Sequence, residues 1–332
     1  MAHVVAAPDK FRGTARAGEV ASAMARGAAA AGWTCDEAPV ADGGEGLLEV
    51  LGGSVRRARV AGPLGQPVEA EWRVRGSTAV VEMARASGLA LVGGPEGNDP
   101  LRASTTGTGE LIAAAVAGGA RTIVVGAGGS ATTDGGLGCL KALQPPARLR
   151  GVELVVACDV TTTFVDAAPL FAPQKGATAA QVALLRSRLE RLAQVYEQDY
   201  GVDVRSLPGG GAAGGLAGGL AAVGARLVAG FELVADSIAL SERIERAELV
   251  VTGEGFLDDQ SFNGKAVGGV VELAQDSGVP VLVVAGQVFG DHGVGAVSLV
   301  DRFGEDRAFT DTLACVEQVV AEELGSQAVR RW

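Results

Sequence analysis

Short, uninterrupted apolar runs alternate with helical patterns along almost the whole chain. A strand that is buried on both faces reads as such a run, and strands of this kind belong to parallel sheets covered by helices on both sides. We expect buried strands over 3–7, 122–125, 154–157, 249–251 and 281–285, and helices over 15–31, 107–117, 179–196, 267–276 and 310–324. The alternation predicts an α/β protein built from parallel βα units.

The length of the chain and one irregular region indicate two domains. With 332 residues the chain exceeds the ~250–300 residues over which a single hydrophobic core usually keeps growing. Residues 67–74 and 78–83 are strand-like and flank an Arg-Gly-Ser turn, which favours an antiparallel hairpin. Because the strands of both chain ends look alike, we expect residues 1–60 and 246–332 to share one discontinuous α/β domain, with residues 61–245 as an inserted, mixed α/β domain.

Composition argues against several classes of protein. The formal net charge is −11, whereas nucleic-acid binding relies on clustered Lys and Arg, so we expect no nucleic-acid partner. The most apolar stretch, 216–235, contains several glycines, Arg226 and Glu232, and so does not meet the requirement of ~20 apolar residues for a bilayer span. No charged segment followed by an apolar one marks a signal peptide. We therefore predict a cytoplasmic protein that does not contact a membrane.

The histidine and cysteine content limits the available chemistry. The four cysteines lie far apart and form no CxxC pair, which is typical of free thiols in a reducing compartment. Only two histidines are present, which disfavours a Ser-His-Asp hydrolase and a His-ligated zinc site. Catalysis would use carboxylates, lysine, hydroxyls and backbone amides. A metal ion would be Mg²⁺, which prefers oxygen ligands, rather than zinc.

Glycines concentrate at the ends of predicted strands, beside Asp, Ser, Thr and Lys. In open α/β sheets ligands bind at the carboxyl ends of the strands. Five polar segments occupy such positions: 7–13, 41–46, 126–136, 157–177 and 252–265.

The first two segments combine acids with cations or glycines before a helix. Segment 7–13 carries an acid with Lys10 and Arg12, which suits anion binding or metal orientation, and an ordinary helix start explains it equally well. In segment 41–46, glycines expose backbone amides and Asp42 could act as a general base or metal ligand. A plain turn with a favourable acid in the first helical turn is the alternative.

Segment 126–136 has the composition of a phosphate cradle. It offers the amides of Gly128, Gly129 and Ser130, the hydroxyl of Thr132 and the start of a helix. It also fits a loose dinucleotide-binding fingerprint, but the acid expected about 20 residues later, at the end of the next strand, is missing. The chain contains no P-loop sequence.

The last two segments add carboxylates and hydrogen-bond donors. Asp159 directly follows a predicted buried strand, and Gln174 and Lys175 are donors suited to a carboxylate or a phosphate. Segment 252–265 holds Glu254 and Asp258 among further polar residues and ends in a lysine. Packing alone does not explain so many polar groups after a buried strand.

Seven short motifs occur in one order along the chain: Ala-Pro-Asp-x-Phe-(Lys/Arg)-Gly, Ala-Asp-Gly-Gly-Glu-Gly, Gly-Thr-Gly-Glu-Leu-Ile, Gly-Gly-Ser-Ala-Thr, Ala-Cys-Asp-Val, Pro-Gln-Lys-Gly-Ala and Thr-Gly-Glu-Gly-x-Leu-Asp-x-Gln-(Thr/Ser). They begin at Ala7, Ala41, Gly107, Gly128, Ala157, Pro173 and Thr252. Each motif is weak alone, but the ordered series is specific. The chain resembles the glycerate kinase type-1 family, the ATP-dependent kinases of D-glycerate.

The resemblance implies two α/β domains, one of them flavodoxin-like or Rossmann-like with a parallel sheet and assembled from both chain ends. It also implies an interdomain cleft where ATP and Mg²⁺ meet D-glycerate, and a product that is either 2- or 3-phosphoglycerate. The chain departs from the family in a short segment before the Ala-Cys-Asp-Val motif, where only residues 144–153 intervene, and in having Thr161–Phe164 instead of Asn-Pro-Leu after it.

For a kinase of this family we hypothesise the following division of labour. Lys10, Arg12 and Lys175 bind the carboxylate of glycerate, with Gln174 nearby, and Asp42 or Asp159 orients and deprotonates the attacking hydroxyl. Phosphates are held by Gly128, Gly129, Ser130 and Thr132, and Mg²⁺ by Asp134, Glu254 or Asp258.

Two other functions remain as alternatives. One is an NAD(P)-dependent dehydrogenase of a small hydroxy acid that uses the loop beginning at Gly126. The other is a catalytically weak, metabolite-binding relative of the kinases. The oligomeric state is left open.

Overall fold

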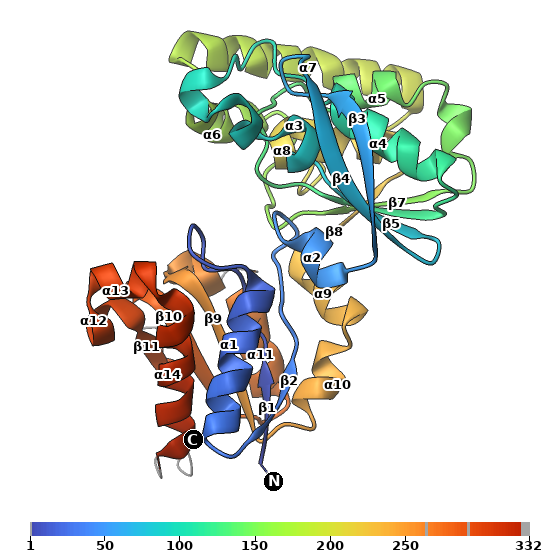
Figure 1. The fold of residues 1–332 in the computed structure, drawn as a ribbon. Helices are drawn as coiled ribbons and strands as arrows, with labels where there is room; N and C mark the ends of the chain where they lie inside the picture. The colour runs from blue at the N-terminus through green and yellow to red at the C-terminus, as the bar shows by residue number, and fades with distance from the viewer. Residues whose placement is uncertain (1, 263–264, 291–292, 327–332) are drawn as a thin grey trace. The chain divides into compact units, whose positions relative to one another are not determined.

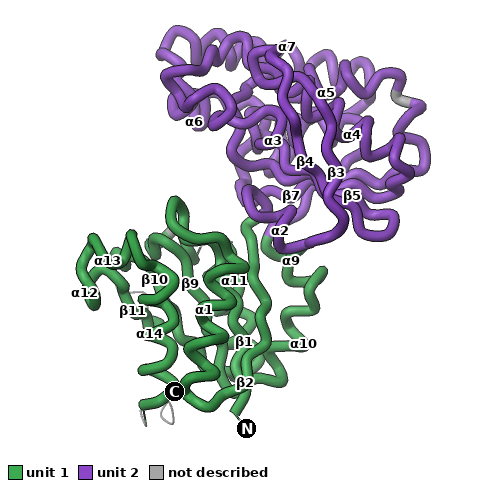
Figure 2. The backbone as a smooth tube through the Cα atoms, in the orientation of Figure 1, with its two compact units in different colours: residues 1–42, 231–332 green, residues 43–230 purple. Residues whose placement is uncertain are grey.

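The computed structural model describes residues 2–262, 265–290 and 293–326 and divides the chain into two compact units (Figures 1 and 2). Unit 1 comprises residues 1–42 and 231–332, and unit 2 comprises residues 43–230. Both chain ends thus belong to unit 1, and the middle of the chain forms unit 2.

The divisions between the units differ from the boundaries predicted at 60/61 and 245/246. They lie earlier along the chain, at 42/43 and 230/231. The strand β3 (Ser54–Ala61) pairs with β4 (Pro67–Arg75) along its whole length and therefore belongs to unit 2. The helices that follow Gly230 before the next strand belong to unit 1.

Unit 1 is built on a parallel sheet with the strand order β11-β10-β9-β1-β2. Its strands are β1 (His3–Ala6), β2 (Thr34–Glu37), β9 (Leu249–Leu257), β10 (Val281–Val288) and β11 (Ala296–Ser298). Its helices are α1 (Ala17–Ala30), α9 (Gly230–Ser237), α10 (Leu240–Ile244), the short 3₁₀ turn η5 (Asp259–Phe262), α11 (Ala266–Asp276), α12 (Leu299–Phe303), α13 (Glu305–Thr310) and α14 (Thr312–Gly325).

Helices cover both faces of this sheet, which explains the continuous apolar runs of its strands. On one face, α1 and α14 lie side by side and share a core with Val284 of β10 (Figure 1). On the other face, Val271 of α11 shares a core with Val283. Because successive strand residues point to opposite faces, both neighbours must be apolar.

Unit 2 is built on a mixed sheet with the strand order β3-β4-β5-β6-β7-β8. After β3 and β4 come β5 (Thr78–Glu82), β6 (Thr122–Gly126), β7 (Glu153–Ala157) and β8 (Arg226–Val228). Its helices are α2 (Leu47–Leu51), α3 (Ala84–Ser87), α4 (Thr106–Ala117), α5 (Leu137–Ala142), α6 (Ala167–Phe171), α7 (Ala179–Tyr200) and α8 (Ala212–Ala222), with the 3₁₀ turns η1 (Leu89–Val92), η2 (Pro95–Gly97), η3 (Pro146–Leu149) and η4 (Pro173–Lys175).

The fold class predicted from the sequence is confirmed. The antiparallel hairpin is formed by β4 and β5, and β5 to β8 are parallel. The predicted helix over 310–324 is in fact two helices, because α13 ends at Thr310 and α14 begins at Thr312. Within the described residues, none of the helices combines the length and apolarity that a membrane crossing requires.

Candidate active site

The order of the strands in unit 1 marks where a ligand would bind. From β1 the sheet continues through β2 on one side and through β9 and β10 on the other. In open α/β sheets ligands bind outside the carboxyl ends of the strands at such a reversal. A cavity of about 220 Å³ lies there. It is lined by Asp9, Lys10, Arg12, Asp42, Glu254, Gly255, Phe256, Asp258 and Lys265.

The lysine of this cavity bridges two carboxylates. Lys10 Nζ lies 3.4 Å from Asp9 Oδ2 and 3.5 Å from Asp42 Oδ1. Burial raises the pKa of Asp9 to about 6, with Asp42 adding to the rise and Lys10 opposing it. For Lys10, burial disfavours the charged form, but the two carboxylates outweigh it and raise the pKa. Asp9 is therefore a buried carboxyl that titrates close to neutral pH.

Glu254 and Asp258 bring further carboxylates to the same cavity. Oε1 of Glu254 is buried and has no hydrogen-bond partner in the part of the chain that the structure describes. Burial raises the pKa of Glu254, although a hydrogen bond from Ser261 opposes the rise. Asp258 accepts a hydrogen bond from the amide of Ser261 at 3.1 Å. Burying a carboxylate oxygen without a hydrogen-bond partner costs free energy and is unusual in proteins. A bound cation would remove this cost.

In unit 2, the predicted phosphate loop follows β6 at the carboxyl edge of the sheet. Its Gly129 carbonyl accepts from Leu89 N, and its Ala131 amide donates to Ser87 O, both at 2.9 Å. Across the described ranges, the amides of Gly128, Gly129 and Ser130 donate to no protein acceptor. The loop is thus held at its flanks while its central amides remain available to an anion.

Segment 41–46 meets this loop, and a glutamate that the sequence analysis did not single out holds it there. A Cβ on Gly128 would lie 2.7 Å from Gly44 Cα. Glu82, buried at the end of β5, accepts hydrogen bonds from Gly46 N at 2.9 Å and Leu48 N at 3.0 Å. The one signal in the sequence was a glutamate that ends an otherwise apolar strand.

Lys175, which was predicted to bind the substrate, lies inside unit 2. It is only 3% exposed, and its Nζ donates to Ser130 Oγ and to Thr132 O, both at 2.7 Å. Burial lowers the pKa of Lys175 to about 7, against the opposing charge of Asp134. The side chain therefore anchors the predicted phosphate loop from inside. The neighbouring Gln174 is exposed.

Asp134 and Thr132, predicted to bind a metal ion and a phosphate, lie in the interior of unit 2 or bond to its backbone. Asp134 accepts hydrogen bonds from Thr105 N and Oγ1, Gly136 N and Gly138 N at 2.9–3.2 Å, so its carboxylate caps a loop and helix rather than facing a metal ion. Thr132 is fully buried, and its hydroxyl has no partner among the described residues. This burial argues against a direct contact of the Thr132 hydroxyl with phosphate.

Asp159 uses one carboxylate oxygen within its own unit. Oδ1 of Asp159 accepts a hydrogen bond from Gly230 N at 2.8 Å, just where the chain leaves unit 2. Gly43, where the chain enters that unit, packs on the same residue, because a Cβ there would lie 2.7 Å from Gly230 Cα. Asp159 therefore fixes Gly230, on which Gly43 packs.

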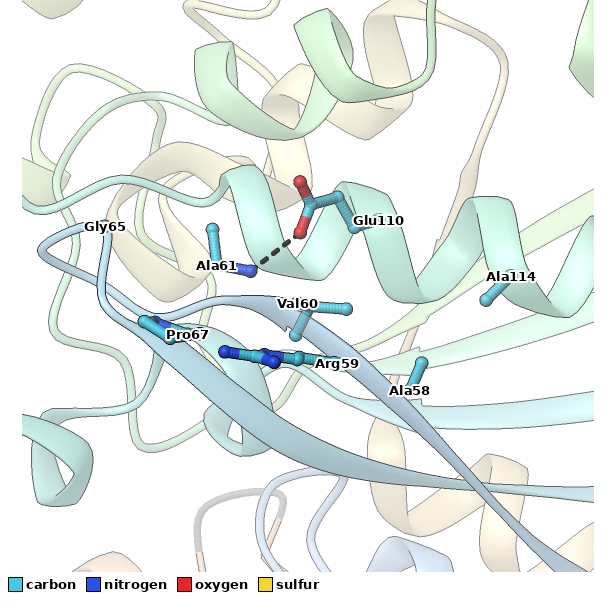
Figure 3. Close-up of a pocket in the computed structure, with 8 residues that line it drawn as sticks. All are labelled: Ala58, Arg59, Val60, Ala61, Gly65, Pro67, Glu110 and Ala114. Atoms are coloured by element: carbon cyan, nitrogen blue, oxygen red, sulfur yellow. Dashed lines mark hydrogen bonds between the residues drawn. The ribbon is translucent and has the colours of Figure 1, made fainter.

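The motif that begins at Gly107 has a structural explanation. A Cβ on Gly107 would lie 1.8 Å from Ala61 O, so α4 approaches β3 closely. Glu110 accepts a hydrogen bond from Ala61 N at 2.7 Å across a shallow hollow lined also by Arg59 and Pro67 (Figure 3). Because the Glu110 carboxylate is bound to Ala61 N, the residues that line this hollow offer no cluster of free charged groups.

Replacing Gly107 with alanine is expected to destabilise the protein. The new Cβ would clash with backbone rather than with a flexible side chain, which costs about 1–3 kcal/mol or more. The free energy of unfolding from urea titration measures the loss. Gly325→Ala is the matched control, because Gly325 also lies in a helix but has open space at its Cβ. Equal stabilities of the two variants would contradict this account of the motif.

Comparison with known proteins agrees with the motifs. The model of the glycerate kinase family matches residues 4–146 and 143–302. The glycerate 2-kinase of Escherichia coli is 39% identical, with 92% of this chain and 90% of that protein covered. The glycerate kinase of Bacillus subtilis is 37% identical, with 90% and 92% covered. A crystal structure from Salmonella typhimurium LT2, assigned as glycerate kinase 2, superposes with a TM-score of 0.85 at 34% identity and covers 99% of both chains.

Proposed function

Because the chain belongs to the glycerate kinase family, we propose that it transfers the γ-phosphoryl group of ATP to a hydroxyl group of D-glycerate. That the enzyme is a kinase acting on glycerate follows from the family. The nucleotide, the stereoisomer and the hydroxyl group are our assignments. Since the relative from Escherichia coli is named a glycerate 2-kinase, we assign the 2-hydroxyl group and thus 2-phosphoglycerate as the product.

The observation that carries this proposal is the charged cavity at the strand reversal of unit 1. It places the cations Lys10, Arg12 and Lys265 beside four carboxylates. Phosphoryl transfer requires positioning and charge neutralisation more than covalent chemistry, so this donor set suits the reaction. Lys10 and Arg12 would bind the carboxylate of glycerate, as expected from the sequence.

The carboxylates of this cavity also fit a magnesium ion. In the part of the chain described, no three acidic, histidine or cysteine side chains form a complete metal site. A nucleotide-bound Mg²⁺ needs only one or two protein carboxylates, because phosphates and water complete its shell. Glu254, with its unpartnered Oε1, and Asp258 would hold the ion. When bound, Mg²⁺ neutralises negative charge on phosphoryl oxygens.

In this proposal Asp9 would act as the general base. A base works best when its pKa lies near the operating pH, and burial brings the pKa of Asp9 to about 6. At neutral pH the carboxylate is mostly ionised and can accept the hydroxyl proton of glycerate. Lys10, which touches both Asp9 and Asp42, would hold the base in position and stabilise its charge. Asp42 would contribute indirectly, by raising the pKa of Asp9.

The loop of unit 2 would bind phosphoryl oxygens through its free amides. Gly128, Gly129 and Ser130 supply these amides, and Lys175 holds the loop in shape by its hydrogen bonds to Ser130 and Thr132. A preformed set of amides avoids reorganisation during the reaction.

The proposal is tested by incubating the protein with ATP, Mg²⁺ and D-glycerate. ADP release coupled to formation of 2-phosphoglycerate, identified by ³¹P NMR, is the expected outcome, with L-glycerate as the control substrate. Formation of 3-phosphoglycerate would correct the hydroxyl assignment only. Thermal stabilisation by ATP and glycerate without any product would instead indicate a catalytically weak relative, and reduction of NAD⁺ would indicate the dehydrogenase alternative.

A further inference from the structure

Three phenylalanines form an exposed aromatic cluster on unit 1. Phe256, Phe289 and Phe309 are 42%, 50% and 41% exposed, and among the described residues they are the only phenylalanines with such exposure. The ring centroids of Phe256 and Phe289 lie 6.4 Å apart with planes at 21°, and those of Phe256 and Phe309 lie 6.4 Å apart at 43°. Exposing the apolar surface of three adjacent rings to water costs free energy, and exposed apolar patches of this kind mark binding sites.

Three separate segments build the cluster. Phe256 lies near the end of β9, Phe289 directly follows β10, and Phe309 lies in α13. The neighbour of Phe256 in the strand, Leu257, is fully buried, so Phe256 is on the outward side of the strand. The amide of Phe289 donates to Leu257 O at 2.9 Å, which places this residue beside the end of β9.

The aromatic cluster is continuous with the charged cavity. Phe256 lines that cavity together with Arg12, Glu254 and Lys265. Phe256 and Arg12 also line a second, small hollow with Phe309. One face of the cluster therefore adjoins a site that combines cations with carboxylates. A ligand complementary to both parts has a flat apolar ring system joined to a polyanion that carries a metal ion.

We propose that Phe256, Phe289 and Phe309 bind the base of the nucleoside triphosphate. This inference rests on the proposed kinase function, which requires such a nucleotide. Purine rings stack on aromatic side chains, and the adjacent cations and carboxylates match the charges of a triphosphate with its magnesium ion. Stacking uses the face that every base has, so the cluster supplies affinity for the base more than discrimination among bases.

The test compares ligands with and without a base on the full-length protein. Calorimetric titration with Mg²⁺–ATP and with Mg²⁺–tripolyphosphate is carried out on wild type, Phe256→Ala, Phe256→Leu and Phe289→Ala. Loss of one stacking ring should weaken ATP binding about 5- to 100-fold and leave tripolyphosphate binding unchanged. Phe256→Leu should be intermediate, because it keeps apolar area but loses the flat face. Leu170→Ala, at an exposed leucine of unit 2, is the control.

Two results would overturn this inference. One is ATP affinity within twofold of wild type in both alanine variants. The other is an equal loss of ATP and tripolyphosphate binding, since a base site cannot affect a ligand without a base. If sedimentation shows a wild-type dimer that Phe256→Ala dissociates while ATP binding is unchanged, the cluster is an interface between copies. Because these are binding measurements, they are independent of the glycerate kinase assay, whose failure would count against the proposed function alone.

Discussion

Asp9→Asn is expected to lower kcat for glycerate phosphorylation by about 10²–10⁴-fold, the usual contribution of a general base. The amide keeps the shape of the side chain and can still accept the hydrogen bond from Lys10 N, but it cannot take up a proton. Steady-state kinetics with both substrates varied measure the effect. Asp199→Asn, at an exposed aspartate of α7, is the control.

The pH dependence separates this role from a structural one. A base with a pKa of about 6 in the free enzyme must be deprotonated to act, so kcat/KM of the wild type should rise with pH, be half-maximal near pH 6 and level off above about pH 7. The pKa of Asp9 rises from 3.8 to about 6 on folding, so between these pH values the native protein binds more protons than the unfolded chain; the stabilisation present below pH 3.8 is lost as pH rises through about 6. Asp9→Asn should therefore be no less stable than wild type at pH 7.5.

Asp42→Asn distinguishes the two candidate bases. Asp42 helps to raise the pKa of Asp9, so removing its charge should move the acidic limb of the kcat/KM profile to lower pH and leave the plateau within about tenfold of wild type. If Asp42→Asn instead loses as much activity as Asp9→Asn, Asp42 is the base, which was one of the two candidates, Asp42 and Asp159, inferred from the sequence.

Lys175→Met is expected to reduce kcat/KM by about 10²-fold, because a misplacement of about 1 Å in a positioning loop has effects of this size. Methionine keeps the apolar length of the chain but leaves Ser130 Oγ and Thr132 O without their donor. Lys141→Met, at an exposed lysine of the same unit, is the control.

The free energy of unfolding of this variant, relative to wild type, should depend on pH. The pKa of Lys175 falls from 10.5 to about 7 on folding, so between these pH values the unfolded chain binds more protons than the native protein. The stability of wild type relative to Lys175→Met should therefore increase as pH rises from 7 towards 10, and should be lowest below pH 7. Urea titrations across this range measure it. A pH-independent difference would mean that the pKa of Lys175 does not change on folding and would contradict its burial in the loop.

Local patterns predicted the elements of the fold well, for a physical reason. A strand such as β10 is buried on both faces, so its consecutive residues are apolar and the strand is recognisable from the sequence. The hairpin of β4 and β5 is recognisable from the turn between the two strands. The unit boundaries were predicted less well. The partner of β3 is the next strand, but a strand sequence does not reveal which sheet it joins.

The sequence by itself determined the α/β class, the family and the segments in which polar groups gather, because periodicity and ordered motifs are properties of neighbouring residues. Only the tertiary structure decided what each polar side chain does. Asp134 and Lys175 form internal hydrogen bonds to Thr105 and Ser130. These partners lie 29 and 45 residues away in the chain, so the local sequence could not reveal the contacts. The raised pKa of Asp9 and the hydrogen bonds that Glu82 accepts from Gly46 and Leu48 likewise depend on residues distant in the chain. The role of a charged group depends on burial and on partners within about 3 Å, and distant segments supply both.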